Sequence, residues 1–236
     1  YLREFLSGQT LDGPVSSATF HYALGRDLMN RIPGCEAYSV VACAAACGVP
    51  VYTSSPGDSS IGMNLAAEAL LNDGGCRLDP NRDVNEVAAI VLGGTRNGCV
   101  ILGGGSPKNF YLQGQPTLWE IYGIEKGGTD YFVQITTDQV VWGGLSGATP
   151  SEAVSWGKVN PSVLPETVVT YCDTTIAFPL LCEYVVGSSV GRRHRKSLYF
   201  EREVLVAELE RQARAVQKLS LIHISEPTRR TPISYA

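Results

Sequence analysis

Short apolar runs alternate with segments of helical periodicity through the middle of the chain. Strands are predicted where the runs are short and apolar, at residues 49–52, 99–102, 130–136 and 168–172. Helices are predicted where apolar side chains recur at helical spacing, at residues 61–71, 83–92 and 174–186. Apolar strands separated by helices indicate an α/β fold with a mostly parallel sheet covered on both faces. The small apolar segment 38–46 fits either a helix or a strand.

Two of the helix starts carry capping signals. Thr149 precedes Pro150, which predicts a short helix over residues 150–156 with the threonine as its cap and proline at its first position. Asp83 is the candidate cap of the helix predicted to begin there.

A charged helix is predicted over residues 191–218, where a basic run leads into a polar segment. Acid–base pairs at helical spacing support it, and these are Glu208 with Arg211 and Glu210 with Arg214. Three leucines are expected to dock it, and these are Leu198, Leu205 and Leu209. We favour this docked helix over the alternative, in which the basic run at 192–196 binds nucleic acid.

The two ends of the chain look unlike natural termini. The sequence starts at Tyr1 without a signal-peptide pattern, so we interpret it as the C-terminal portion of a longer protein. Residues 219–229 resemble the read-through translation of a transposon-type sequencing adapter, and the alternative is a short strand with a polar tail. The predicted organisation is a domain over residues 1–190, the charged helix over 191–218 and an artefact tail over 219–236.

Composition narrows the class of protein. A net charge of −4, with 44% hydrophobic and 18% charged residues, is typical of a globular protein without general attraction to nucleic acid or membranes. No apolar window approaches the about 18 residues of a membrane span. The seven cysteines are odd in number and form no CxxC. Free thiols of a cytoplasmic protein are therefore expected, without disulfides or a metal site.

Polar loops follow the predicted strands. They are rich in Gly, Ser, Thr and Asp, and they cover residues 53–62, 103–109, 136–147 and 173–175. Ligands of parallel α/β sheets bind beyond the carboxyl ends of the strands, which is where these loops lie. Because no GxGxxG fingerprint is present, they do not form an ordinary dinucleotide motif.

One segment, residues 148–158, gathers a carboxylate, an indole and an amine. Glu152 and Trp156 suit a cationic amine, and Lys158 suits an imine intermediate. By spacing alone, a surface-exposed Lys158 is favoured, while Glu152 fits a helix-surface residue equally well and Trp156 fits a core residue.

Four motifs in this order resemble those of the deoxyhypusine synthase family. They are Asp58–Gly62, Ile101–Gly105 with Lys108, Ser146–Ala148 with Ser155–Lys158, and Tyr171–Asp173 with Phe178–Leu181. The resemblance covers about residues 1–190. It implies a Rossmann-like three-layer sandwich, assembled as a homotetramer.

The resemblance also implies a reaction. NAD takes a hydride from a polyamine such as spermidine. The resulting imine loses diaminopropane, and a lysine holds the remaining aminobutyl group as an imine. An acceptor amine takes this group, and NADH returns the hydride. The acceptor is a protein lysine in deoxyhypusine synthase, on the way to hypusine, and putrescine in the related homospermidine synthases.

Site residues follow by position. The resemblance makes Lys158 the imine-forming nucleophile, Glu152 the ligand of an ammonium group and Trp156 the wall of the polyamine channel. Asn109 and Gly147 stand at further substrate positions. The implied NAD-binding residues are Asp58, Ser60, Gly104, Thr137, Asp138, Asp173 and Thr174.

Several family positions differ here. Met63, Trp142 and Leu145 replace acids, and Asn109 replaces a histidine. A neutral channel leaves ammonium groups uncompensated, so an altered amine substrate is expected. The alternatives are homospermidine synthase activity and a non-catalytic NAD-binding homologue. This part of the protein alone is expected to be inactive.

Overall fold

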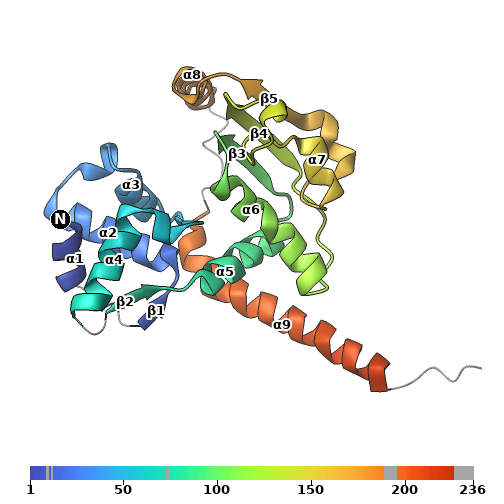
Figure 1. Ribbon diagram of the computed structural model, residues 1–236, viewed down its shortest axis with the longest axis horizontal. Helices are drawn as coiled ribbons and strands as arrows, with labels where there is room; N and C mark the ends of the chain where they lie inside the picture. Colours follow the sequence, from blue (N-terminus) through green and yellow to red (C-terminus); the bar gives the residue numbers. More distant parts are fainter. Residues whose placement is uncertain (9–10, 12, 73–74, 189–195, 226–236) are drawn as a thin grey trace, which may run out of the picture.

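The computed structural model describes all residues except 9–10, 12, 73–74, 189–195 and 226–236 (Figure 1). The described residues form an α/β fold with two parallel sheets, which confirms the predicted fold class. The first sheet pairs β1 (Gly13–Val15) with β2 (Cys76–Leu78). The second has the order β3 (Gly98–Leu102), β4 (Tyr131–Thr136), β5 (Thr167–Tyr171).

Helices connect and cover these strands. They are α1 (Leu2–Gly8), α2 (Ser17–Arg31), α3 (Val40–Cys47), α4 (Ser60–Leu71), α5 (Pro80–Gly93), α6 (Ser106–Pro116), α7 (Pro150–Ser155), α8 (Thr174–Gly187) and α9 (Leu198–Ser225). Short helical turns lie between them, at η1 (Cys35–Ala37), η2 (Pro56–Asp58), η3 (Thr117–Ile121), η4 (Val140–Trp142) and η5 (Pro161–Glu166). The last three predicted strands and all the predicted helices are confirmed, with bounds shifted by a few residues. The ambiguous segment 38–46 is mostly helix α3.

The strand predicted at 49–52 is wrong. These residues join no sheet, and the first sheet pairs β1 with β2. The backbone here bonds to side chains of α2: the Val51 carbonyl lies 3.0 Å from His21 Nδ1, and the Thr53 N–H donates to Ser17 Oγ at 3.0 Å. An apolar run therefore lies in an extended connection that side chains hold.

The cap predicted for α5 is also wrong. The helix begins at Pro80, and Asp79 caps it by accepting the Asn81 N–H at 2.9 Å. Asp83 lies one turn inside the helix and is 2% exposed. Proline at the first helical position explains the earlier start. At α7 the prediction is confirmed, because Thr149 accepts the Glu152 N–H at 3.2 Å.

One face of the three-stranded sheet builds a core against α6 and α7. Ile101 and Phe132 of the sheet pack with Leu112 of α6 and Ala153 of α7. On the opposite face Val100 is 56% exposed and Val168 is 50% exposed, so the predicted cover on both faces is incomplete for this sheet among the described residues. The covered face is therefore the one that leads to the lysine segment.

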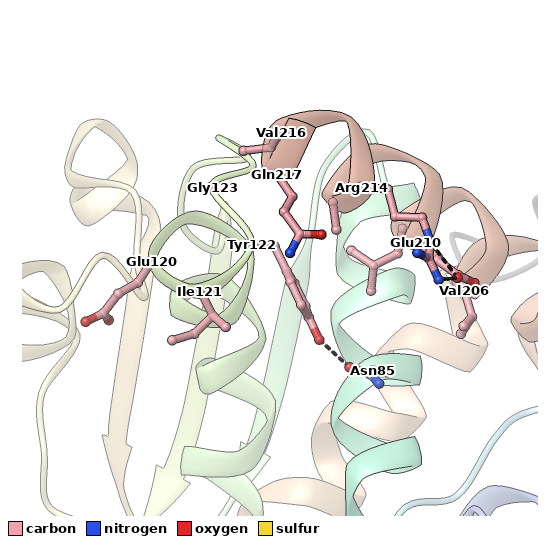
Figure 2. A pocket seen from close by; sticks show the side chains of 12 residues that line it. Asn85, Glu120, Ile121, Tyr122, Gly123, Val206, Glu210, Arg214, Val216 and Gln217 are labelled. Atoms are coloured by element: carbon pink, nitrogen blue, oxygen red, sulfur yellow. Dashed lines mark hydrogen bonds and ion pairs between the residues drawn. The ribbon is translucent and has the colours of Figure 1, made fainter. Parts of the chain in front are cut away.

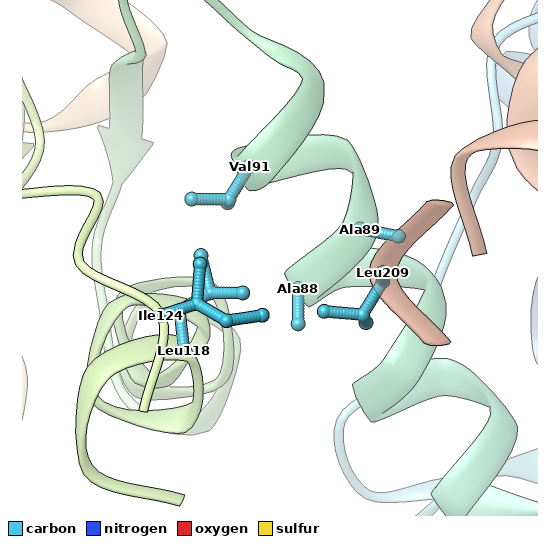
Figure 3. Close-up of a cluster of buried hydrophobic side chains, with 6 residues drawn as sticks. All are labelled: Ala88, Ala89, Val91, Leu118, Ile124 and Leu209. Atoms are coloured by element: carbon cyan, nitrogen blue, oxygen red, sulfur yellow. The ribbon is translucent and has the colours of Figure 1, made fainter. Parts of the chain in front are cut away.

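The C-terminal helix α9 crosses the molecule and docks on α5 (Figure 1). Leu209 is 3% exposed and packs with Ala88 and Ala89 of α5, and these belong to a cluster that extends to Leu118 and Ile124 (Figure 3). Leu205 packs against the same cluster, and Leu198 is partly buried. Both predicted ion pairs form, Arg211 to Glu208 at 2.6 Å and Arg214 to Glu210 at 2.5 Å. The docked helix is thus confirmed, and it continues to Ser225, whereas residues 192–195 of the basic run lie outside the described part.

Leu209→Ala is expected to lower the free energy of unfolding by about 2–5 kcal/mol, because it leaves a cavity between α9 and α5. The matched control is Val204→Ala on the same helix. Val204 is 73% exposed, so its truncation should change stability by less than about 0.5 kcal/mol. Urea unfolding followed by circular dichroism measures both. Equal effects of the two substitutions would contradict the docking of α9.

Candidate active site

Three of the four polar loops meet at one edge of the sheet. Because the strands are parallel and in register, Leu102 lies beside Ile135 and Thr136 beside Tyr171. Backbone bonds extend this register into the loops, with the Gly103 N–H donating to the Ile135 carbonyl at 2.8 Å. The predicted cofactor residues of these loops therefore start from a common edge, and they are Gly104, Thr137, Asp138, Asp173 and Thr174.

Serine hydroxyls join the fourth loop, residues 53–62, to this edge. Ser106, next to the glycine run, lies 2.9 Å from the Ser54 hydroxyl and 3.1 Å from the Ser55 hydroxyl. Asp58 ends η2 and Ser60 opens α4 on the same loop, and both side chains are exposed. The structure thus connects the 53–62 loop to the glycine loop, residues 103–109.

Glycine is required where two loops touch. Gly104 has φ of +157°, and a Cβ there would lie 2.6 Å from the Ser146 Cα. A Cβ at Gly147 would lie 2.6 Å from the Gln139 carbonyl oxygen. The loops can therefore approach only without side chains at these positions. Gly147 was predicted to bind substrate. It packs against the Gln139 backbone and is absent from the residues that line the neighbouring cavity.

A cavity of about 240 Å³ opens between α6, α7 and the loop before α7. It gathers four of the predicted site residues, namely Asn109, Glu152, Trp156 and Lys158. Other lining side chains are Lys108, Leu112, Leu145, Thr149 and the alanines Ala148 and Ala153. Lys158 Nζ donates to Asn109 Oδ1 at 2.9 Å and lies 5.9 Å from the centre of the Trp156 ring. Lys158 is partly buried and Trp156 is 64% exposed, so neither the exposed lysine nor the core tryptophan of the alternative reading is found.

Burial tunes the amine of Lys158. Partial desolvation lowers its pKa below that of a free lysine, and the negative charge of Glu152 opposes this shift. A lowered pKa leaves a larger fraction of the amine neutral, and the neutral amine is the nucleophile. The cavity therefore combines an amine of lowered pKa with a carboxylate.

A buried polar pair, Lys108 and Gln134, fixes the loops around the cavity. Lys108 Nζ donates to Gln134 Oε1 at 3.0 Å and to the Ala148 carbonyl at 2.6 Å. Gln134 Nε2 in turn donates to the carbonyls of Gly103 at 2.8 Å and Ser146 at 2.7 Å. Gln134 was not predicted from the sequence. The available signal was a polar residue in the apolar strand at 130–136.

Three positions where the resemblance implies acids carry apolar side chains, and one of the three lines the cavity. Leu145 lines the cavity and is 49% exposed, while Met63 and Trp142 are exposed elsewhere in the described chain. Among the described lining residues, Glu152 is the sole carboxylate. The cavity therefore offers one strong cation partner.

A larger cavity of about 700 Å³ lies elsewhere, between α5, η3 and α9 (Figure 2). It contains no predicted site residue. Four of its polar side chains form pairs, with Tyr122 donating to Asn85 at 2.5 Å and Arg214 pairing with Glu210 (Figure 2). Size alone therefore does not locate the chemistry.

No group of three or more His, Cys, Asp or Glu side chains among the described residues is arranged to hold a metal ion. No helix in the same residues has the length and apolar character to cross a membrane.

The site belongs to a protein of the α/β class, and it places a partly buried lysine beside glycine-rich loops at the sheet edge. Comparison with known proteins gives the family. The family model of deoxyhypusine synthase matches residues 1–185, and the chain belongs to this family. It is 48% identical over 217 residues to a deoxyhypusine synthase-like protein of Nostoc punctiforme, covering 89% of this chain and 55% of that protein. A protein of the same name from Cyanothece sp. is 44% identical, with 99% and 62% covered. The chain thus spans a little over half the length of these relatives.

Glu152→Gln is expected to lower the pKa of Lys158 further, because it removes the negative charge that favours the ammonium form. The pH dependence of Lys158 acetylation, followed by mass spectrometry of its peptide, measures this. The midpoint should move to lower pH. Ser151→Ala, a neutral change on the same turn, should leave it in place, and a midpoint that rises in Glu152→Gln would contradict this electrostatic role.

Proposed function

We propose that this protein is an NAD-dependent transferase that moves an aminobutyl group from a polyamine to an acceptor amine, with Lys158 as the covalent nucleophile. One observation carries the proposal. The Lys158 amine, with its lowered pKa, is held by Asn109 in a cavity that also contains Glu152 and Trp156. A cavity of this kind suits a cationic amine and a lysine imine.

Recognition of the amine rests on two side chains. Glu152 neutralises an ammonium group, and the exposed face of Trp156 attracts a cation and covers the alkyl chain. Because Leu145 faces the same cavity, the remaining wall favours a hydrocarbon segment over a second ammonium group. We therefore propose a spermidine-like substrate with one ammonium group bound at Glu152.

The edge loops fit NAD in their chemistry. Gly103, Gly104 and Gly105 all have positive φ and leave the backbone accessible at this edge, while a Cβ at Gly103 would face open space. Asp173 is ionised, because the bonds from Thr175 lower its pKa, and carboxylate and hydroxyl groups suit ribose. The residues that would hold NAD are Asp58, Ser60, Gly104, Thr137, Asp138, Asp173 and Thr174. NAD, when bound, supplies an acceptor that takes up and later returns a hydride.

Lys158 performs the group transfer. Its neutral amine adds to the imine carbon of the oxidised polyamine. The carbon–nitrogen bond to diaminopropane then breaks, and a proton from the Lys158 amine moves to the departing nitrogen. The aminobutyl group is then an imine on Lys158. An acceptor amine adds to the same carbon and releases Lys158, and the new imine is reduced. Asn109 orients the lysine amine by accepting its N–H.

The complete protein is proposed to act as a homo-oligomer in the cytoplasm. Apolar side chains on α8 support assembly, because Ile176, Leu180 and Tyr184 are each more than 60% exposed. Since this chain spans just over half of its relatives, the acceptor is left as a protein lysine or a free diamine such as putrescine. The second candidate is a non-catalytic NAD-binding homologue, which the neutral residues Met63 and Leu145 favour.

Borohydride trapping tests the proposal. The complete gene product that contains this chain is incubated with NAD and a panel of polyamines, reduced, and digested for mass spectrometry. An aminobutyl adduct is expected on Lys158 and should vanish in Lys158→Arg, because the guanidinium stays protonated. Lys126→Arg, whose amine bonds to the Gly94 carbonyl, should keep the adduct. NAD binding without an adduct from any polyamine would favour the non-catalytic homologue.

A further inference from the structure

A chain of buried hydrogen bonds fixes the start of the 53–62 loop. Asp83 of α5 accepts the Ser17 N–H at 2.7 Å and the Ser17 hydroxyl at 2.6 Å. The Ser17 oxygen then accepts the Thr53 N–H at 3.0 Å. Asp83 is 2% exposed and Ser17 fully buried, so water does not compete for the two bonds between them, and the bond from Thr53 is partly buried. A carboxylate inside one helix thus determines where the backbone of the loop begins.

The two residues before Thr53 are anchored in the same way. His21 Nδ1 lies 2.7 Å from the Ser17 carbonyl and 3.0 Å from the Val51 carbonyl. Because both partners are acceptors, Nδ1 carries a proton. The Tyr52 hydroxyl donates to Glu86 at 2.8 Å. Three consecutive residues without a strand partner are therefore held by side chains of α2 and α5.

The C-terminal helix joins this network. Arg202 of α9, 6% exposed, donates to Glu86 at 3.0 Å and lies 3.3 Å from both Ser16 and Thr19 of the α2 start. Its guanidinium stacks 4.0 Å from the centre of the Tyr199 ring. Helix α9 thus reaches the acid that holds Tyr52.

We propose that Asp83 and Ser17 are positioning residues for the NAD site, acting through the Thr53 backbone on the loop that carries Asp58 and Ser60. The inference rests on the proposed function, because it assumes that this loop binds NAD. Its physical basis is the direction of the Ser17 hydroxyl. The Ser17 hydroxyl donates its hydrogen bond to Asp83, so a lone pair of the hydroxyl oxygen faces the Thr53 N–H. An amide at position 83 can donate to that oxygen and compete with Thr53.

Asp83→Asn separates positioning from folding. Burial raises the pKa of Asp83 to about 6, although the Ser17 bonds lower it. Since this value lies above the ordinary carboxyl value of 3.8, the ionised group reduces stability as pH rises towards 6, and the reduction persists at neutral pH. The neutral amide removes this effect. The Asp83→Asn variant should therefore keep the wild-type melting temperature at pH 7, while the Thr53 backbone is no longer fixed to Ser17.

The experiment uses the complete gene product and two readouts. Amide hydrogen exchange at Thr53, measured without NAD, should accelerate in Asp83→Asn and in Ser17→Ala. The dissociation constant of NAD, measured by calorimetry, should rise about five- to tenfold in both, as expected for one lost hydrogen bond. The control is Asp79→Asn, the same chemical change one turn earlier on α5, where asparagine caps as well as aspartate. It should alter neither readout.

The outcomes separate the two proposals. Faster exchange at Thr53 with weaker NAD binding in Asp83→Asn, but not in Asp79→Asn, supports the positioning role. Wild-type NAD affinity in Asp83→Asn would refute that role alone, and so would unchanged exchange at Thr53. A wild-type protein that does not bind NAD would refute the proposed cofactor together with this role.

Discussion

The bond between Lys108 and Gln134 is the interaction on which the candidate site depends. Both side chains are almost completely buried, and their remaining hydrogen bonds reach the backbones of the glycine loop and of the loop before α7. A buried donor or acceptor without a partner costs about 1–3 kcal/mol, so these loops have little freedom to move away from each other. The cavity of Lys158 exists because two irregular segments share this one polar contact.

Periodicity predicted the elements that supply the core. Strands β3 to β5 and helices α4, α7 and α8 appear where apolar spacing placed them, because their formation depends on local pattern and on caps such as Thr149. The segment 49–52 failed because a local pattern does not show that the Val49 N–H bonds to the Ala44 carbonyl and the Val51 carbonyl to His21 of α2, where a strand would need a neighbouring strand. Asp83 failed as a cap because Pro80 starts the helix earlier and leaves the aspartate free to bond Ser17.

The candidate site divides in the same way. The resemblance named Asn109, Glu152, Trp156 and Lys158, and the structure places these four around one cavity. The order of the strands explains why the loops predicted to bind NAD share an edge. Spacing could not indicate that Gly147 faces the Gln139 backbone, or that Gln134 joins the loops. Such contacts depend on the register between strands and on side-chain direction, and neither is written in a local pattern.

Arg202 has a practical consequence for where the polypeptide can be cut. The residue stands 116 positions after Glu86 in the chain, yet its guanidinium pairs with that partly buried carboxylate, which also accepts the Tyr52 hydroxyl. Proteolysis between α8 and α9 that released the last helix would remove the cation that pairs with Glu86 and expose the ring of Tyr22, which stacks on Tyr199 at 3.8 Å. The charged helix α9 is therefore part of the packed structure of the amino-terminal half.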